Sequence, residues 1–384
     1  MSAYESEFRR LLGAAGIALG GAQPWDIQVH DQRAYRRCLA GGAIGLGESY
    51  MDGCWDSVAL DQSFERILQS GIRDQMRLQP GLLLAAAAEQ LPNLGYVIPG
   101  MRPLVARFQN IWATAETHYD VGNEFYRRLL DPNMIYSCGY WAEATSLPEA
   151  QLAKLELACR KLQLEPGMRV LDIGCGWGSF AKYAAETHGA SVVGVTISRE
   201  QQQLAQERCA HLPVEIRLMD YRDIAGGFDR IVSFGMFEHV GRANFRRYLE
   251  IAHRSLEADG LMLLETIGAD RSGLACNPWF QKYIFQAPTS MFPSISELSR
   301  AAEGLFVIED WHNFGADYAP TLRGWDARLE QSRDWIVANY SERFFRMWRF
   351  YLLSCAGAFA ARAYQMWQIV LSPGGVPGGY RFQR

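Results

Sequence analysis

The sequence predicts an α/β protein in which a mostly parallel β-sheet carries helices on both faces, with a small, mainly helical domain at its N-terminus. Apolar runs typical of buried strands alternate with amphipathic helical patterns between residues 168 and 266, as in parallel sheets with crossover helices. A glycine-rich stretch, Val170-Leu-Asp-Ile-Gly-Cys-Gly-Trp-Gly178, follows the first of these strands and opens a helix. Such strand–turn–helix units bind nucleotides at the carboxyl end of the strand.

The N-terminal part of the chain shows mostly helical patterns. We predict helices over 5–20, 35–40 and 60–72, a short strand over 25–30, and a glycine-punctuated loop over 41–55. Residues 1–90 are therefore predicted to form the helical N-terminal domain. Because prolines and glycines gather in 92–103, we expect a linker over 91–112.

Residues 113–384 are predicted to form the second domain, in which a helix over 147–162 precedes the sheet. We expect strands over 168–173, 191–196, 214–219, 229–234 and 261–266, and helices over 178–187, 199–210 and 242–256. An insertion over 268–300 interrupts the alternation. A strand follows over 307–311, and 322–370 is expected to be largely helical.

Composition excludes several classes of protein. The chain has 384 residues, 49% of them hydrophobic, and a net charge of −4, which indicates a folded protein with no general attraction to nucleic acid. Its eight cysteines include no C-x-x-C pair, which argues against a zinc site or a disulfide scaffold and favours a reducing cytoplasm. No signal peptide is apparent, and the longest apolar run, 82–88, is too short to span a bilayer. We therefore expect any membrane contact to be peripheral.

The positive charge is concentrated near the C-terminus. Residues 321–384 contain nine arginines and four acids, a local balance of +5. These arginines form either an ordinary solvated helical face or a surface for anionic lipid headgroups, and the sequence leaves both interpretations open.

The glycine loop does not follow the dinucleotide pattern. Its spacing is G-x-G-x-G rather than G-x-G-x-x-G, and the next strand ends in Thr196 rather than in an acid. The stretch Val170–Gly178 instead resembles the S-adenosylmethionine (AdoMet) loop of class I methyltransferases. Three further stretches extend the resemblance: Tyr136-Ser-Cys138, Phe237-Glu-His-Val-Gly241 and Asn313-Phe-Gly-Ala-Asp-Tyr318. With them, nearly the whole chain is similar to the cyclopropane synthases that act on phospholipid acyl chains or on mycolic acids.

The resemblance implies a reaction. AdoMet would donate a methyl group to the cis double bond of an unsaturated phospholipid acyl chain, and a base would remove a proton as the cyclopropane ring closes. It also implies a cytoplasmic enzyme at the inner face of the membrane, commonly a homodimer, with lipid contacts in 1–90 and 268–300. An alkene has no proton to lose first, so catalysis depends on orientation and on sheltering a cation, which aromatic rings do well. Candidate aromatic residues are Tyr119, Tyr136, Phe237 and Tyr318, which are otherwise ordinary core residues.

The resemblance also assigns cofactor-binding positions: Tyr136, Ser137, Val170, Asp172, Gly174, Cys175, Gly176, Trp177, Gly178, Thr196, Ile197, Ser198, Gln201, Asp220, Tyr221 and Arg222. Thr196 and Gln201 would meet the ribose in place of the usual acid, and Asp220 would lie near the adenine. Asp172 either contacts the cofactor or merely holds its own loop.

For the base, the resemblance implies a bicarbonate ion held by Cys138, Glu238, the backbone of Ile267, and Tyr318. At the remaining position this chain has Glu265 where the family usually has histidine. Bicarbonate beside an ionised Glu265 would cost about 4 kcal/mol at 4 Å and an effective dielectric constant of about 20. Glu265 is therefore protonated, or its carboxylate takes the place of bicarbonate and accepts the proton, which we favour. A third possibility is that Glu265 points elsewhere and water fills the gap.

Other residues and functions remain open at this point. His239 either relays protons or orients a neighbour. Cys138 and Cys355 resemble nucleophiles, but alkene methylation needs none, so we expect Cys138 to shape the anion pocket and Cys355 to pack in a helix. Alternative functions are a methyltransferase giving a methyl-branched or methylene chain, a dinucleotide-dependent oxidoreductase, and a non-catalytic lipid-binding protein.

Overall fold

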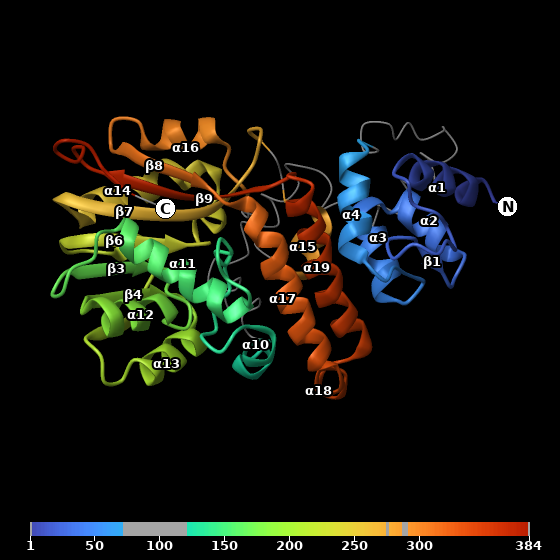
Figure 1. Cartoon of the computed structure of the whole chain (residues 1–384), viewed down its shortest axis with the longest axis horizontal. Helices are drawn as coiled ribbons and strands as arrows, with labels where there is room; N and C mark the ends of the chain where they lie inside the picture. The colour runs from blue at the N-terminus through green and yellow to red at the C-terminus, as the bar shows by residue number, and fades with distance from the viewer. Residues whose placement is uncertain (1, 72–120, 274–275, 286–290, 383–384) are drawn as a thin grey trace. The chain divides into compact units, whose positions relative to one another are not determined.

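A computed structural model describes residues 2–71, 121–273, 276–285 and 291–382 (Figure 1). The predicted linker and Tyr119 lie outside these residues. The described chain forms two compact units. One contains 121–273, 291–321 and 364–382, and the other contains 2–71, 276–285 and 322–363.

The first unit is built on a seven-stranded sheet. Its strands are β3 (Arg169–Ile173), β4 (Ser191–Thr196), β5 (Val214–Leu218), β6 (Phe228–Phe234), β7 (Leu256–Gly268), β8 (Val307–Asn313) and β9 (Gln365–Ser372), in the order β5-β4-β3-β6-β7-β9-β8. The five strands from β3 to β7 are parallel, whereas β9 runs antiparallel to both of its neighbours. The predicted α/β class and mostly parallel sheet are confirmed.

Helices cover both faces of this sheet, as Figure 1 shows. The helices of the unit are α10 (Asn123–Leu129), α11 (Leu147–Lys161), α12 (Ser179–His188), α13 (Arg199–Arg208), α14 (Phe245–Ser255) and α16 (Ile295–Ala302). Apolar side chains of α11, α12 and α13 form one core with β3, β4 and β6, and those of α14 and α16 form a second core on the opposite face. Helix α11 begins where predicted because Ser146 and Glu149 form a capping box.

Residues 322–360 are largely helical, as predicted for 322–370, but strand β9 contradicts the last part of that prediction, from residue 365 onward. Met366, Trp367 and the four residues after Trp367 are all buried, so β9 shows none of the alternation that marks a half-exposed strand. A short, continuous apolar run does not distinguish a buried strand from a helix, and we assigned it wrongly. The strand inserts between β7 and β8 and completes the sheet.

The second unit is mainly helical. It contains α1 (Ala3–Ala14), α2 (Arg33–Ala40), α3 (Gly42–Met51), α4 (Leu60–Gln69), α15 (Pro278–Tyr283), α18 (Arg333–Asn339), α19 (Glu342–Ala360) and the two-stranded pair β1 (Gln28–Val29) and β2 (Trp55–Asp56). Helix α17 (Tyr318–Gln331) starts in the first unit, and its residues from 322 belong to this one. Phe350 of α19 packs against Tyr50 and Phe64, which explains why this helix groups with the N-terminal helices and not with the predicted domain 113–384.

Helix α3 is a second correction, since we predicted a loop over 41–55. Two of its glycines, Gly45 and Gly47, are required by close packing, whereas Gly42 at its start has a φ of 54°. A Cβ at Gly45 would clash with the carbonyl oxygen of Arg37, and a Cβ at Gly47 would lie 2.3 Å from Nε1 of Trp279. Glycine in a helix interior costs conformational entropy, but here it allows α3 to pack closely against α2 and α15.

The arginines of the C-terminal helices are largely engaged within the helical unit. Three of them form ion pairs with acids from the N-terminal segment: Arg323 with Asp61 at 2.6 Å, Arg343 with Asp52 at 2.8 Å, and Arg346 with Asp56 at 2.7 Å. Because these arginines are paired within the protein, a structural role for the local positive charge is favoured over a surface that binds anionic lipid headgroups. None of the helices in the described part of the chain is long and apolar enough to cross a membrane.

Candidate active site

The glycine loop lies at the carboxyl end of β3 and leads into α12. Gly174, Gly176 and Gly178 have φ angles of 83°, 54° and 75°, in the left-handed region that favours glycine. A Cβ at Gly174 would also lie 3.0 Å from the side chain of Met236. The loop therefore needs glycine both for its turn and for an open path to its backbone.

Polar contacts hold this loop against the segment before α11. Arg208 of α13 donates to the carbonyl oxygens of Trp177, at 2.7 Å, and of Asn133, at 2.8 Å. The indole of Trp177 donates to Oδ1 of Asn123 at 2.7 Å. These contacts hold the glycine loop and residues 133–137 on opposite sides of a cavity.

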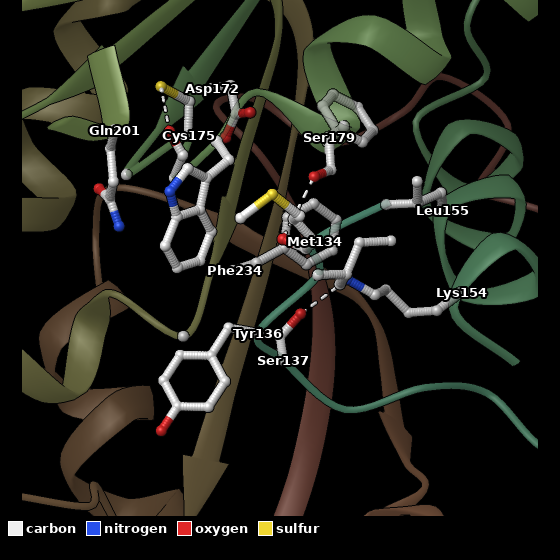
Figure 2. A pocket seen from close by; sticks show the side chains of 16 residues that line it. Met134, Tyr136, Ser137, Lys154, Leu155, Asp172, Cys175, Ser179, Gln201 and Phe234 are labelled. Carbon is white, nitrogen blue, oxygen red and sulfur yellow. Dashed lines mark hydrogen bonds between the residues drawn. The ribbon is translucent and has the colours of Figure 1, made fainter. Parts of the chain in front are cut away.

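The cavity between the glycine loop and residues 133–137 has about 570 Å³ of empty space and is open to solvent on one side (Figure 2). Eight of the predicted cofactor residues line it: Tyr136, Ser137, Asp172, Gly174, Cys175, Gly176, Trp177 and Gln201. The other eight do not: Val170, Gly178, Thr196, Ile197, Ser198, Asp220, Tyr221 and Arg222.

Three of these remaining residues hold the elements or side chains that line the cavity. Val170 lies in the core of the sheet, and Gly178 caps α12. Thr196 donates through Oγ1 to Oε1 of Gln201 at 2.8 Å and so orients an amide that lines the cavity.

Asp220 follows β5 and accepts three hydrogen bonds from Arg222 at 2.6–2.9 Å. Burial alone would raise the pKa of Asp220, but the contacts with Arg222 hold it below its usual value. The turn Asp220–Arg222 is therefore an ordered, ionised group beside the sheet edge.

Asp172 is the most unusual group in the cavity. Its side chain is 1% exposed, and neither carboxylate oxygen has a hydrogen-bond partner among the described residues. Burial raises the pKa of Asp172 to about 7, and the positive charge of Lys154 opposes this shift. A buried, unpartnered carboxylate beside an open glycine backbone fits AdoMet, whose amino-acid end carries an ammonium group.

A second polar cluster contains the residues expected to act as, or hold, the base. Glu238 accepts a hydrogen bond from the backbone N–H of Ile267 at 2.6 Å, and burial raises the pKa of this carboxyl to about 7. Burial also raises the pKa of the Cys138 thiol, with a contribution from Glu265, and that of Tyr318, with contributions from Cys138, Glu238 and Glu265. The structure thus brings these five residues together. Since Cys138 and Tyr318 stay protonated, they are not themselves bases, and the Cys138 thiol donates to the carbonyl oxygen of Gly139 at 3.2 Å.

Glu265 lies on β7 and is fully buried. Its Oε2 accepts a hydrogen bond from the side-chain amide of Gln368 on β9 at 2.9 Å, and its Oε1 has no partner among the described residues. Burial raises the pKa of Glu265, while Lys154 and the Gln368 amide favour the ionised form. Glu265 is therefore part of the cluster, with one oxygen available to accept a proton.

Three predicted residues lie apart from this cluster. Phe237 stacks on Phe245 at 4.4 Å in the core formed with α14, the ordinary role that we gave as its alternative. The side chain of His239 is exposed. Cys355 lies on α19 in the helical unit, where desolvation raises the pKa of its thiol.

Sequence reasoning missed Lys154. The residue is 1% exposed and lines the cavity, and its ammonium donates to Oγ of Ser137 at 2.7 Å and lies 4.2 Å from the ring centre of Phe234. A signal was present, because Lys154 falls in the apolar stripe of the predicted helix, beside Leu155 and Ala158. Gln368 was also missed, because β9 itself was not predicted.

Comparisons with known proteins agree with this site. Residues 107–369 match the family model described as mycolic acid cyclopropane synthetase. The chain is 48% identical to the cyclopropane-fatty-acyl-phospholipid synthase of Escherichia coli K12 over 374 residues, which cover 97% of this chain and 94% of that protein. It is 35% identical to cyclopropane mycolic acid synthase 1 of Mycobacterium tuberculosis H37Ra over 265 residues, covering 65% and 92%.

A solved mycolic acid cyclopropane synthase complexed with SAH and CTAB superimposes with a TM-score of 0.63 at 33% identity, covering 69% of this chain and 99% of that one. These findings confirm the predicted class I methyltransferase fold and an AdoMet-dependent enzyme, and they exclude the dinucleotide-dependent alternative. The chain belongs to the mycolic acid cyclopropane synthetase family.

Proposed function

We propose that this chain converts the cis double bond of an unsaturated phospholipid acyl chain into a cyclopropane ring, with AdoMet as the source of the added carbon. The observation that carries the proposal is the cluster of the buried Cys138, Glu238 and Glu265 with the partly buried Tyr318, in the same unit as the glycine-loop cavity. The E. coli relative, similar over almost the whole chain, supports a phospholipid acyl chain as the substrate.

The cofactor would be held by the residues that line the cavity, with Asp172, Ser137 and Gln201 as polar contacts. When bound, AdoMet supplies an electrophilic methyl group, whose bond to sulfur breaks, leaving the electron pair on the sulfur, as the methyl carbon adds to the double bond. The chain's own contribution is to exclude water and hold the reactants in line, which accounts for much of the catalysis of such reactions.

Ring closure then requires the loss of one proton from the new methyl group, whose C–H electron pair forms the last C–C bond. We propose that Oε1 of Glu265 accepts this proton. The carboxylate has the two-oxygen geometry of bicarbonate, one oxygen lacks a partner, and Gln368 donates to the other. Glu238 accepts from the backbone N–H of Ile267, and Cys138 and Tyr318, both protonated, belong to the same cluster.

The function is tested by incubating the protein with labelled AdoMet and monounsaturated phospholipid vesicles and analysing the lipid by mass spectrometry and NMR. A cyclopropane signal is expected. A methyl-branched or methylene chain would support the alternative product, and a lipid without label would indicate a non-catalytic relative. Peripheral binding to the membrane and a homodimer remain parts of this proposal, and vesicle sedimentation and light scattering test them.

The identity of the base is tested separately with bicarbonate. Desalted wild-type protein should change its rate by less than about twofold when bicarbonate is added, whereas Glu265→Gln should lose about 10²–10⁴-fold in rate, as expected for a removed general base. Glu265→His, which restores the usual family residue, should become dependent on bicarbonate. Strong stimulation of the wild type would contradict an internal base.

A further inference from the structure

The cavity carries a distinctive charge pattern. Among the described residues that line it, Lys154 and Asp172 are the only ones with charged side chains, and both are 1% exposed (Figure 2). Lys154 comes from α11 and Asp172 from β3, so two different elements place opposite charges in one small space. Burying these groups is unfavourable unless each meets a counter-charge or hydrogen-bond partners.

The two charges attract each other, but neither group has its full set of hydrogen bonds among the described residues. Lys154 makes one hydrogen bond among the described residues, to Ser137, although an ammonium group can donate three. Asp172 accepts none. Two further carboxylates act on Lys154; both oxygens of Asp131 have donors of their own, whereas Glu265 has a donor to Oε2 only. Asp131 accepts from the backbone N–H groups of Asn133 and Ile135, both at 2.9 Å, and Glu265 accepts from Gln368.

A zwitterion would satisfy both groups at once. Resting on the proposed use of AdoMet, we propose that Lys154 is a cofactor-binding residue that, together with Ser137, receives the carboxylate of the amino-acid end of AdoMet, while Asp172 receives its ammonium group. Nothing in the sequence motifs assigns this role to Lys154, because the residue lies on α11, outside the glycine loop and outside the Tyr136-Ser-Cys138 stretch.

This assignment explains the position of Ser137. Its hydroxyl accepts from Lys154, so its own hydrogen remains available to a carboxylate, and the two donors lie side by side on the same wall. A lysine that served only to pack α11 against the sheet would not need to end at the cavity. Lys161, one heptad further along α11, is such a lysine, since it pairs with Asp310 at 3.3 Å and does not line the cavity.

The test measures dissociation constants by calorimetry for three ligands: S-adenosylhomocysteine, its decarboxylated analogue, and 5′-methylthioadenosine, which lacks the amino-acid end. Lys154→Met should weaken S-adenosylhomocysteine about ten- to a hundredfold, the range for one charged hydrogen bond. It should change binding of the other two ligands by less than about twofold. Lys161→Met, a matched replacement of a buried lysine on the same helix, should leave all three unchanged.

Two outcomes would overturn the inference. Equal weakening of all three ligands by Lys154→Met would show that the residue only shapes the loop, and unchanged binding of S-adenosylhomocysteine would show that it faces Glu265 instead. If Lys154→Met does not fold, Lys154→Gln, which can still donate to Ser137, provides the same comparison. Wild-type protein that binds no S-adenosylhomocysteine would contradict the proposed function itself, so the two failures are distinguishable.

Discussion

Replacing Asp172 with asparagine should stabilise the ligand-free protein, and the gain should grow with pH. In the folded state burial raises the pKa of Asp172 from 3.8 to about 7. The native state therefore binds this proton more tightly than the unfolded state, so the wild type loses stability as pH rises between these two values. Asparagine never ionises, so it does not show this loss.

The size of the effect follows from the two pKa values. At 1.36 kcal/mol per pH unit, the carboxyl group destabilises the fold by about 1.7 kcal/mol at pH 5 and about 4 kcal/mol at pH 8. The advantage of Asp172→Asn should therefore increase by about 2–3 kcal/mol between these conditions. For a folding unit of about 150–250 residues, this is a difference in melting temperature on the order of 5 °C or more.

Thermal melts of both proteins at pH 5 and pH 8, without ligand, measure this difference. Asp220→Asn serves as a control of opposite sign, because Arg222 holds the pKa of Asp220 below its usual value and its ionised form stabilises the fold. An Asp172→Asn protein that melts below the wild type at pH 8, or whose advantage does not grow with pH, would refute the reasoning. The same variant should bind S-adenosylhomocysteine more weakly, since Asp172 is the one carboxylate among the described residues that line the cavity.

Three further predictions concern other parts of the chain. Glu238→Gln should lower the methyl-transfer rate about ten- to a hundredfold, the range for one hydrogen bond to a charged group, because it weakens the bond to the Ile267 backbone. The dissociation constant of S-adenosylhomocysteine should stay within about twofold, because Glu238 does not line the cavity, and a large change in affinity would contradict this separation. Gly47→Ala should destabilise the helical unit by about 1–3 kcal/mol in urea denaturation, because its new methyl group meets Trp279, and an unchanged midpoint would show that α3 can move away. Arg346→Met should lower the melting temperature because it removes bonds to Asp56 and the Tyr50 carbonyl, yet should not reduce binding to anionic vesicles; reduced binding would revive the headgroup interpretation.

The sequence predicted the parts of the molecule that depend on local rules. The strand, glycine turn and helix around Val170–Gly178 were predictable because the positive φ angles of that turn exclude other residues and because the flanking periodicities differ. The same holds for α11, whose start is marked by its capping box. Lys154 could have been predicted to be a buried functional residue in the same way, because it is a charged residue in the apolar stripe of this helix.

Other parts depend on tertiary contacts that no local pattern records. The glycines of α3 indicated a loop because the two neighbours that require them, Arg37 and Trp279, are respectively a few residues away and more than two hundred residues away. Likewise, β9 is recognisable as a strand only when β7 and β8 are on either side of it. The position of Gln368 beside Glu265 follows from that pairing, so the sequence alone could name Glu265 but not its partner.

The hydrogen bond between Glu265 and Gln368 also explains how a glutamate can be accommodated at a position where the family usually has histidine. A buried carboxylate needs donors, and the amide of Gln368 provides one to Oε2. An amide side chain can turn over and present its oxygen instead, and Oε1 of Gln368 has no partner among the described residues. Gln368 can therefore donate to a carboxylate or accept from an imidazole N–H at the same register position. Glu265→His should consequently fold without a second change, whereas Glu265→Leu should be destabilised by about 1–3 kcal/mol because it leaves this amide buried and unpaired. The bicarbonate dependence of the Glu265→His protein would then report a change in the base and not a disturbed core.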